Sequence, residues 1–158
     1  NTNYANTKKQ AVSDNIMIEA MGGEAAQQYN KGYYYLTGTG DAKQSYTEAR
    51  KWFDLAAKSN VPAVRYKIGR LFETGTLYQQ SYTEAVKHYS YAADKGDIYA
   101  MNNLAILYLN GAGVTKDNEK GIALFTRAAE TGNVEAQVNL GIYYLTTIYS
   151  KIKYIVTP

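Results

Sequence analysis

The chain has no cysteine, one histidine and two prolines among its 158 residues. The absence of cysteine excludes disulfide bonds, thiolate metal sites and a cysteine nucleophile. A single histidine leaves no histidine pair for a zinc site. No apolar run approaches the roughly 18 residues that a transmembrane helix needs. We therefore expect no metal, no cofactor and no insertion into a membrane.

Charge of one sign is also never concentrated. The formal net charge is +3, and the densest basic points are the pairs Lys8-Lys9 and Arg50-Lys51. Nucleic-acid-binding proteins usually carry a basic stripe, so we expect no nucleic-acid partner. An apolar fraction of 46% with 20% charged residues is typical of a soluble globular protein. The opening segment "NTNYANTKKQ" lacks an initiator Met and an apolar leader core, which favours a processed or trimmed chain.

What the chain does contain is an internal repeat. The hexamer "QSYTEA" occupies residues 44–49 and returns at residues 80–85. Small residues recur with the same period of about 36 residues. The positions in phase are Ala49, Ala85 and Gly121; Ala56-Ala57, Ala92-Ala93 and Ala128-Ala129; and Gly32, Gly69, Ala105 and Gly141. We therefore predict an all-α fold, a short right-handed α/α superhelix of helix-turn-helix repeats.

Each repeat contains two helices. Apolar residues at helical spacing, such as Leu104, Leu107 and Tyr108, mark the first helix, and a glycine follows it as a C-terminal cap. The hexamer starts the second helix, because Ser45 and Glu48 form an S-x-x-E capping box. The other predicted N-caps are Ser81 with Glu84, Asp117, and, for the next first helices, Asn60, Asp97 and Asn133.

The predicted boundaries follow from this period. Residues 1–10 form an N-terminal arm, and residues 11–146 form the repeat domain. Terminal repeats are often atypical, because they close the stack. The tail at 147–158 leaves the pattern and is rich in β-branched residues, so it caps the stack, pairs with another chain or stays flexible. The repeat domain divides into a partial repeat at 11–25, repeats at 26–62, 63–99 and 100–135, and a partial repeat at 136–146.

The sequence resembles the SLR (Sel-one-like repeat) family, which is related to the tetratricopeptide repeats. The segments that carry the resemblance are "AMNNLAILYLNGAGV" at 100–114, "VNLGIYYL" at 138–145, "ARKWFDLAAKS" at 49–59 and "AVKHYSYAADKG" at 85–96. The resemblance covers about residues 11–146. It implies an α-solenoid that acts as a bacterial adaptor, and we favour an exported or periplasmic location over the cytoplasm.

No residue pattern indicates catalysis, and we predict no catalytic residue. His88 aligns with Trp52 and Leu124, on a helix face that should be buried in every repeat, so a packed histidine is the interpretation we favour. The "GTG" at 38–40 and "GAG" at 111–113 lack the G-K-[ST] of a phosphate loop and are explained as helix-ending loops.

The resemblance implies that the first helix of each repeat lines a concave groove. We take Gly32, Gly69, Ala105 and Gly141 as the reference position. Predicted partner-binding residues lie three positions before it, one after it and four after it: Tyr29, Tyr33, Tyr66, Arg70, Glu73, Asn102 and Ile106. For Leu109, Ile142 and Leu145, packing against a neighbouring repeat or the tail is an equal alternative. Lys51, Lys58, Lys87 and Lys95 are interpreted as a solvated outer face.

Three functional hypotheses follow. The first is an interaction module that binds a partner protein or an extended peptide in the groove, as a monomer or weak homo-oligomer. The second is a structural protein that self-associates through the tail or the incomplete end repeats. The third is a small-ligand-binding or hydrolytic protein, of the kind suggested for Cys-rich relatives of the family. We favour the first.

Overall fold

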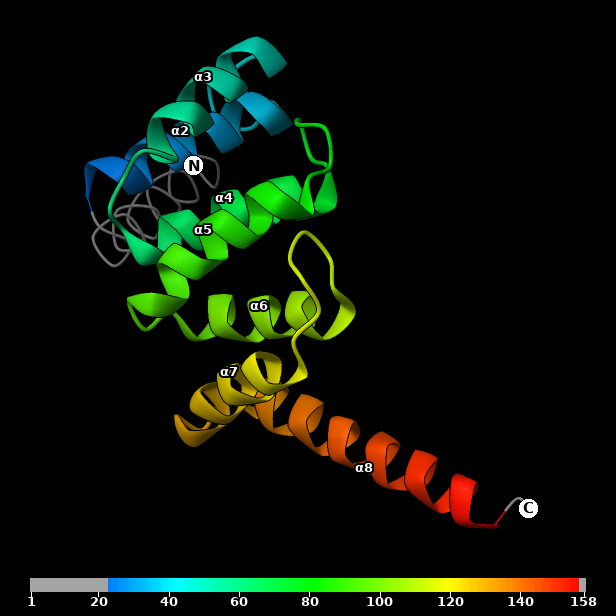
Figure 1. Ribbon diagram of the computed structural model, residues 1–158. Helices are drawn as coiled ribbons and strands as arrows, with labels where there is room; N and C mark the ends of the chain where they lie inside the picture. Colours follow the sequence, from blue (N-terminus) through cyan, green and yellow to red (C-terminus); the bar gives the residue numbers. More distant parts are fainter. Residues whose placement is uncertain (1–22, 157–158) are drawn as a thin grey trace, which may run out of the picture. The chain divides into compact units, whose positions relative to one another are not determined.

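The structure is a computed structural model that describes residues 23–156. These residues form helices joined by short loops and contain no strand (Figure 1). The helices are α2 (Glu24–Thr37), α3 (Tyr46–Ala56), α4 (Pro62–Thr74), α5 (Tyr82–Asp94), α6 (Ile98–Asn110), α7 (Asn118–Glu130) and α8 (Val134–Val156). The predicted N-terminal arm, 1–10, and the helix expected at 11–21 lie outside the described residues.

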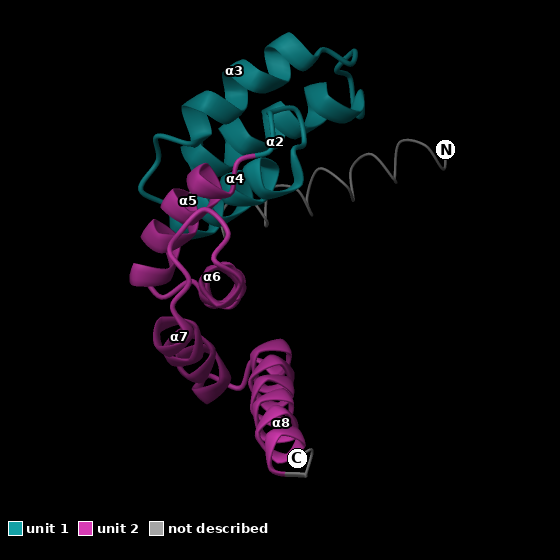
Figure 2. Cartoon of the chain, turned by 45° about the vertical axis from the view of Figure 1, so that its right-hand side comes forward, with its two compact units in different colours: residues 1–80 teal, residues 81–158 magenta. Residues whose placement is uncertain are grey.

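The chain divides into two compact units, residues 1–80 and 81–158 (Figure 2). Of the described helices, unit 1 holds α2, α3 and α4, and unit 2 holds α5 to α8. Consecutive helices within a unit pack as hairpins, for example α2 with α3 and α6 with α7. Such a pair buries the apolar stripe of each helix against its neighbour.

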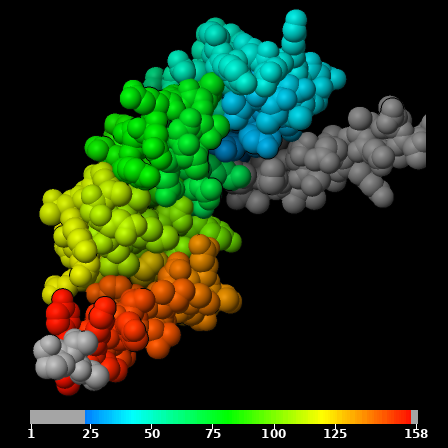
Figure 3. All heavy atoms as spheres, turned by 90° about the vertical axis from the view of Figure 1, so that its right-hand side faces the viewer, coloured from blue at the N-terminus to red at the C-terminus, as the bar shows by residue number. Residues whose placement is uncertain are grey.

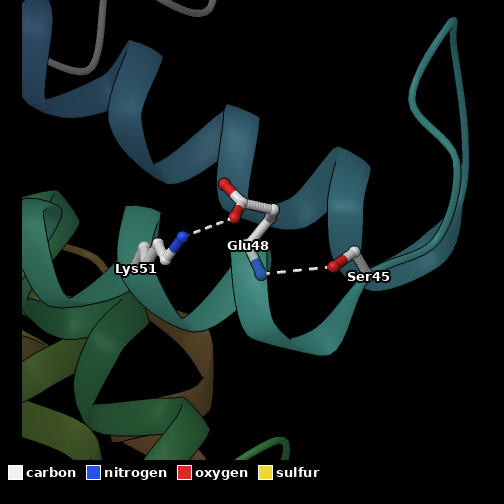
Figure 4. Close-up of polar contacts among 3 residues, drawn as sticks. All are labelled: Ser45, Glu48 and Lys51. Atoms are coloured by element: carbon white, nitrogen blue, oxygen red, sulfur yellow. Dashed lines mark hydrogen bonds and ion pairs between the residues drawn. The ribbon is translucent and has the colours of Figure 1, made fainter.

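The repeated hexamer starts a helix, as predicted. Ser45 Oγ accepts a hydrogen bond from the Glu48 backbone N–H at 3.3 Å (Figure 4), and Ser81 Oγ does the same for Glu84 at 3.2 Å. Each bond satisfies one of the backbone donors that a helix N-terminus leaves open. The predicted caps Asp97, Asp117 and Asn133 are confirmed in the same way.

Two details of the capping prediction are wrong. The Glu48 side chain does not reach back to the cap amide, because the Ser45 N–H donates to Tyr35 O at 2.9 Å and the Glu48 carboxylate pairs with Lys51 Nζ at 2.6 Å. Asn60 does not cap α4. That helix begins one residue later than predicted, after Val61, and no side chain caps it. Pro62 compensates, since its fixed φ suits the first helical position and its missing N–H needs no partner.

The first helices of the three repeats end at glycine, as predicted. Gly38, Gly75 and Gly111 adopt φ of 70°, 71° and 65°. This left-handed conformation carries little cost only without a Cβ. The loops that follow therefore turn at the same point of each repeat.

Small residues occupy the places where two helices come close. Gly32 of α2 is buried, and a Cβ added there would lie 2.8 Å from the Phe53 ring of α3. The equivalent buried positions hold Gly32 and Ala49 in the first repeat but Ala105 and Gly121 in the third. A Cβ on Gly121 would lie 3.1 Å from the Ala105 carbonyl oxygen. Each helix pair thus keeps one glycine and one alanine, in exchanged order.

Helix α8 departs from the others in length. It continues through the tail to Val156, so the described part of the tail is helical, and its C-terminal half extends beyond α7 (Figures 1 and 2). Among the described residues, no helix combines the length and the apolar character needed to cross a membrane.

Candidate functional site

Four predicted partner-binding residues meet in unit 1. Tyr29 and Tyr33 lie one turn apart on α2, and Tyr66 and Arg70 lie one turn apart on α4. Arg70 Nη1 donates to the Tyr66 hydroxyl at 3.5 Å. Tyr33, Tyr66 and Arg70 all lie close enough to Tyr29 to act on its ionisation. We call these four residues the tyrosine cluster.

The tyrosine cluster rests on the core of its unit. The Tyr29 ring packs on Phe53 with ring centroids 5.1 Å apart, and Phe53 is fully buried. Tyr33, by contrast, is 48% exposed, Arg70 is exposed and Tyr66 is half-buried. The cluster therefore combines a fixed aromatic base with side chains that reach solvent.

Electrostatics distinguish this surface from an ordinary exposed face. Burial raises the pKa of Tyr29 to about 12; the nearby Tyr33 and Tyr66 add to this effect, and Arg70 opposes it. Burial also lowers the pKa of Lys67, whose Nζ lies 5.2 Å from the centre of the Tyr29 ring. Charges in such a partly desolvated place interact more strongly than charges in bulk water. Arg70 and Lys67 thus place two basic side chains beside Tyr29.

The other predicted residue of unit 1 is Glu73, which is half-buried near the end of α4. Its backbone carbonyl accepts a hydrogen bond from Gln80 Nε2 at 2.8 Å, which fixes the loop after α4. The predicted role of Glu73 in partner binding stays a prediction.

A pocket of about 600 Å³ lies in unit 2 between α6, α7 and α8. The predicted residue Ile106 lines it with Leu109 of α6 and Phe125 of α7. Helix α8 contributes Tyr143 and Tyr154, and polar residues also line the pocket: Lys116, Asn139 and Lys151. Its size falls within the range of sites that hold small molecules or one large side chain.

Asn102 requires a correction. Its helical phase matches Tyr29 and Tyr66, and the sequence analysis placed it in the groove, yet only 2% of it is exposed. Asn102 Oδ1 instead accepts a hydrogen bond from Asn139 Nδ2 at 3.1 Å. This hydrogen bond joins two short amide side chains between α6 and α8. Asn102 therefore orders unit 2 and does not face solvent.

Two contributions to these surfaces escaped the sequence analysis. Lys67 lies beside Tyr29, yet it stands two positions before the reference glycine, where the repeat pattern singled out no residue. Tyr154 lines the pocket from the tail, outside the repeat. A search for aromatic and basic residues one turn from the predicted groove positions would have found Lys67.

His88 is buried, with 5% exposed, as its place in the repeat predicts. Among the described residues, no group of three or more His, Cys, Asp or Glu side chains could hold a metal ion.

Comparison with known proteins gives the same architecture. The Sel1 repeat pattern matches residues 28–61, 62–97, 98–133 and 134–146, which is most of the chain. Helix pairs α2–α3, α4–α5 and α6–α7 fall within the first three of these segments, and α8 begins the fourth.

Solved structures share this fold. A protective antigen of uropathogenic Escherichia coli strains with an SLR fold superposes with a TM-score of 0.73 at 31% identity, over 85% of this chain and 28% of its own. A Sel1 repeat protein from Oxalobacter formigenes gives 0.68 at 25% identity, over 89% and 98%. Cysteine-rich protein B of Helicobacter pylori gives 0.56 at 18% identity, over 75% and 98%, which shows the fold alone.

One curated relative comes from a plant. The HRD3B component of an ERAD-associated E3 ubiquitin-protein ligase from Arabidopsis thaliana is 42% identical over 45 residues. The match covers 28% of this chain and 8% of the plant protein. The predicted all-α repeat fold is confirmed by these comparisons together with the helices described above.

Proposed function

Because the chain belongs to the Sel1 repeat family, we propose that it is an interaction module that binds a segment of another protein through the tyrosine cluster. Stacks of such repeats typically serve protein–protein interaction, which their extended surfaces allow. The observation that carries the proposal is the meeting of Tyr29, Tyr33, Tyr66 and Arg70 on one face of unit 1.

The chemistry of this face specifies the kind of segment. Aromatic side chains with one guanidinium are the residue types that dominate binding energy at protein interfaces. Arg70 offers a planar set of donors that suits a carboxylate, and Lys67 adds a second positive charge close by. Tyr33 and Tyr66 supply apolar area. The proposed ligand is therefore an extended segment with an acidic side chain next to an apolar one.

Capture from a cell lysate followed by mass spectrometry tests this proposal. Wild type is compared with a variant that carries Tyr66→Ala and Arg70→Ala. A partner retained by wild type and lost by the folded variant supports binding at the tyrosine cluster. Synthetic peptides of that partner, with each acidic residue changed to its amide, then identify the group that meets Arg70.

A matched control removes one tyrosine and one basic residue elsewhere in unit 1. Tyr46 is 59% exposed on α3, and Lys51 lies on the same helix, so the control carries Tyr46→Ala and Lys51→Ala. It should capture the same partner as wild type. Equal capture by all three proteins would refute the tyrosine cluster as the binding surface.

The pocket of unit 2 favours a second candidate function, the binding of a small molecule. It combines about 600 Å³ of space with a lining that includes Ile106, Tyr143 and the basic Lys151. A thermal-shift panel of metabolites would reveal such a ligand. Its stabilisation should disappear in Ile106→Asp and persist in the variant Tyr66→Ala with Arg70→Ala.

A further inference from the structure

Helix α8 carries an apolar stripe along one face. Six residues form this α8 stripe, and each is between 51% and 71% exposed: Val138, Ile142, Leu145, Ile148, Tyr149 and Ile152. Apart from the adjacent pair Ile148 and Tyr149, they recur every three or four positions, so they share one side of the helix. Leu145, Ile148, Tyr149 and Ile152 make up the C-terminal part of the stripe (α8 is orange to red in Figure 3).

The opposite side of α8 packs inside unit 2. Ala136 is fully buried and Tyr143 and Thr147 are half-buried, on the side that meets the rest of the unit. The surroundings of Gly141 show that no second helix packs against the stripe side within the described chain. Its counterpart Gly32 receives the Phe53 ring of a second helix, whereas nothing in the described chain lies within 4 Å of a Cβ added to Gly141. The stripe is a helix-packing face that no described helix covers.

We propose that a second copy of this chain covers the α8 stripe, with the two α8 helices antiparallel and crossing at Leu145. The stripe is symmetrical about that residue. Ile142 and Ile148 stand three positions to either side of Leu145, Gly141 and Tyr149 stand four, and Val138 and Ile152 stand seven. A two-fold pair needs a face that complements itself, and a palindromic stripe provides one.

The antiparallel arrangement also places a small residue of one copy opposite a large residue of the other, and an acidic residue opposite a basic one. The exposed Gly141 of one copy faces Ile148 of the other, so the larger side chain has room. Glu135 and Lys153 are eighteen positions apart, about five full turns, and therefore share one edge of the stripe. Reversal of the second helix brings its Lys153 within about 3 Å, along the axis, of Glu135 in the first.

The area is sufficient for a stable contact. The six stripe residues together expose on the order of 700 Å², close to the ~800 Å² that each partner contributes to a standard protein interface. Exposed apolar patches of this size are uncommon on soluble monomers, which supports a covered state. This inference does not depend on the tyrosine cluster, which lies in the other unit.

Light scattering over a range of concentrations tests the pairing. We expect the mass of the wild type to rise from 17.6 kDa to twice that value as concentration increases. Leu145→Asp should weaken dimerisation by about thirtyfold or more, since it places two charges at the centre of the contact. Leu55→Asp is the matched control, because Leu55 is an exposed leucine of α3, away from the stripe, and it should dimerise like the wild type.

The orientation is tested with single cysteines, which the natural chain lacks. In an antiparallel pair centred on Leu145, two Leu145→Cys side chains lie side by side and a short bis-maleimide should join them. Two Val134→Cys side chains would lie about 33 Å apart, since they are separated by 22 helical positions, and should stay uncrosslinked.

Three outcomes would overturn the proposal. A wild type that stays at the monomer mass at every concentration would leave the stripe to another protein or to another segment of this chain. A dimer that Leu145→Asp leaves intact would place self-association elsewhere. Crosslinking of Val134→Cys as efficient as that of Leu145→Cys would show parallel helices. Folding of each variant is checked by circular dichroism.

Discussion

The same position of the repeat holds a glycine in two different surroundings. We predict that replacing this glycine by alanine changes the free energy of unfolding in opposite directions at the two places. Gly32 and Gly141 both lie inside first helices at the reference position. Replacing either by alanine should favour the helix by about 1 kcal/mol, because alanine lowers the backbone entropy cost. The two positions differ in what the added methyl group would meet.

At Gly32 the methyl group meets a filled core. The added Cβ would lie 2.8 Å from two ring carbons of Phe53 and 3.1 Å from a third, and Phe53 is fully buried against Tyr29. Overpacking of this kind costs about 1–3 kcal/mol. Gly32→Ala should therefore destabilise the protein by about 0–2 kcal/mol, after the gain of about 1 kcal/mol in helix propensity. Gly141→Ala meets nothing within 4 Å and should stabilise by about 1 kcal/mol.

Urea denaturation followed by circular dichroism measures both free energies of unfolding. It is performed at a concentration at which the variants are monomeric, so that α8 pairing makes no contribution. The fluorescence of Trp52, the only tryptophan, reports unit 1 separately. Equal stabilisation by the two substitutions would refute the packing argument. Adding Phe53→Leu to Gly32→Ala should cost less than the sum of the single changes, because the smaller side chain makes room for the methyl group.

Two further predictions concern the cap and the cluster. Ser81→Ala should lower the free energy of unfolding by about 1 kcal/mol, because the Glu84 N–H loses its acceptor, and Ser81→Asp should restore it; urea denaturation checks both. The pKa of Tyr29 rises on folding from 10.0 to about 12, so the unfolded chain loses this proton first and stability should fall as pH rises through that window. NMR titration of ring-labelled Tyr29 should give a midpoint near 12, and Arg70→Ala should raise it further; a midpoint near 10 would contradict the burial of the phenol.

The local features of this fold could be predicted from the sequence because each depends on neighbouring residues. Ser45 and Ser81 cap helices, and Gly38 ends one, through contacts a few positions away. Because the repeat returns every 36 residues or so, the same capping residues could be recognised in each repeat. The burial of His88 followed from its alignment with apolar positions.

The predictions that were wrong concern contacts that do not recur with the repeat. Asn102 shares its helical phase with Tyr66, but its burial depends on Asn139, which lies in the following repeat. Asn60 does not cap α4, because the residue before a proline disfavours the helical conformation, so Val61 stays extended and the helix begins at Pro62. The helical conformation of the tail could not be predicted, because β-branched residues disfavour helices in isolation. In the structure the tail continues a helix already nucleated within unit 2.

The exchanged order of glycine and alanine constrains how such a chain can be recombined. Joining the first helix of the first repeat to the second helix of the third would place two glycines, Gly32 and Gly121, in one helix pair. The reciprocal chimera would bring Ala105 and Ala49 together and crowd the pair. Breakpoints within a repeat would therefore be penalised and breakpoints between repeats tolerated. The whole helix pair, rather than the single helix, is the part that can be duplicated or transplanted.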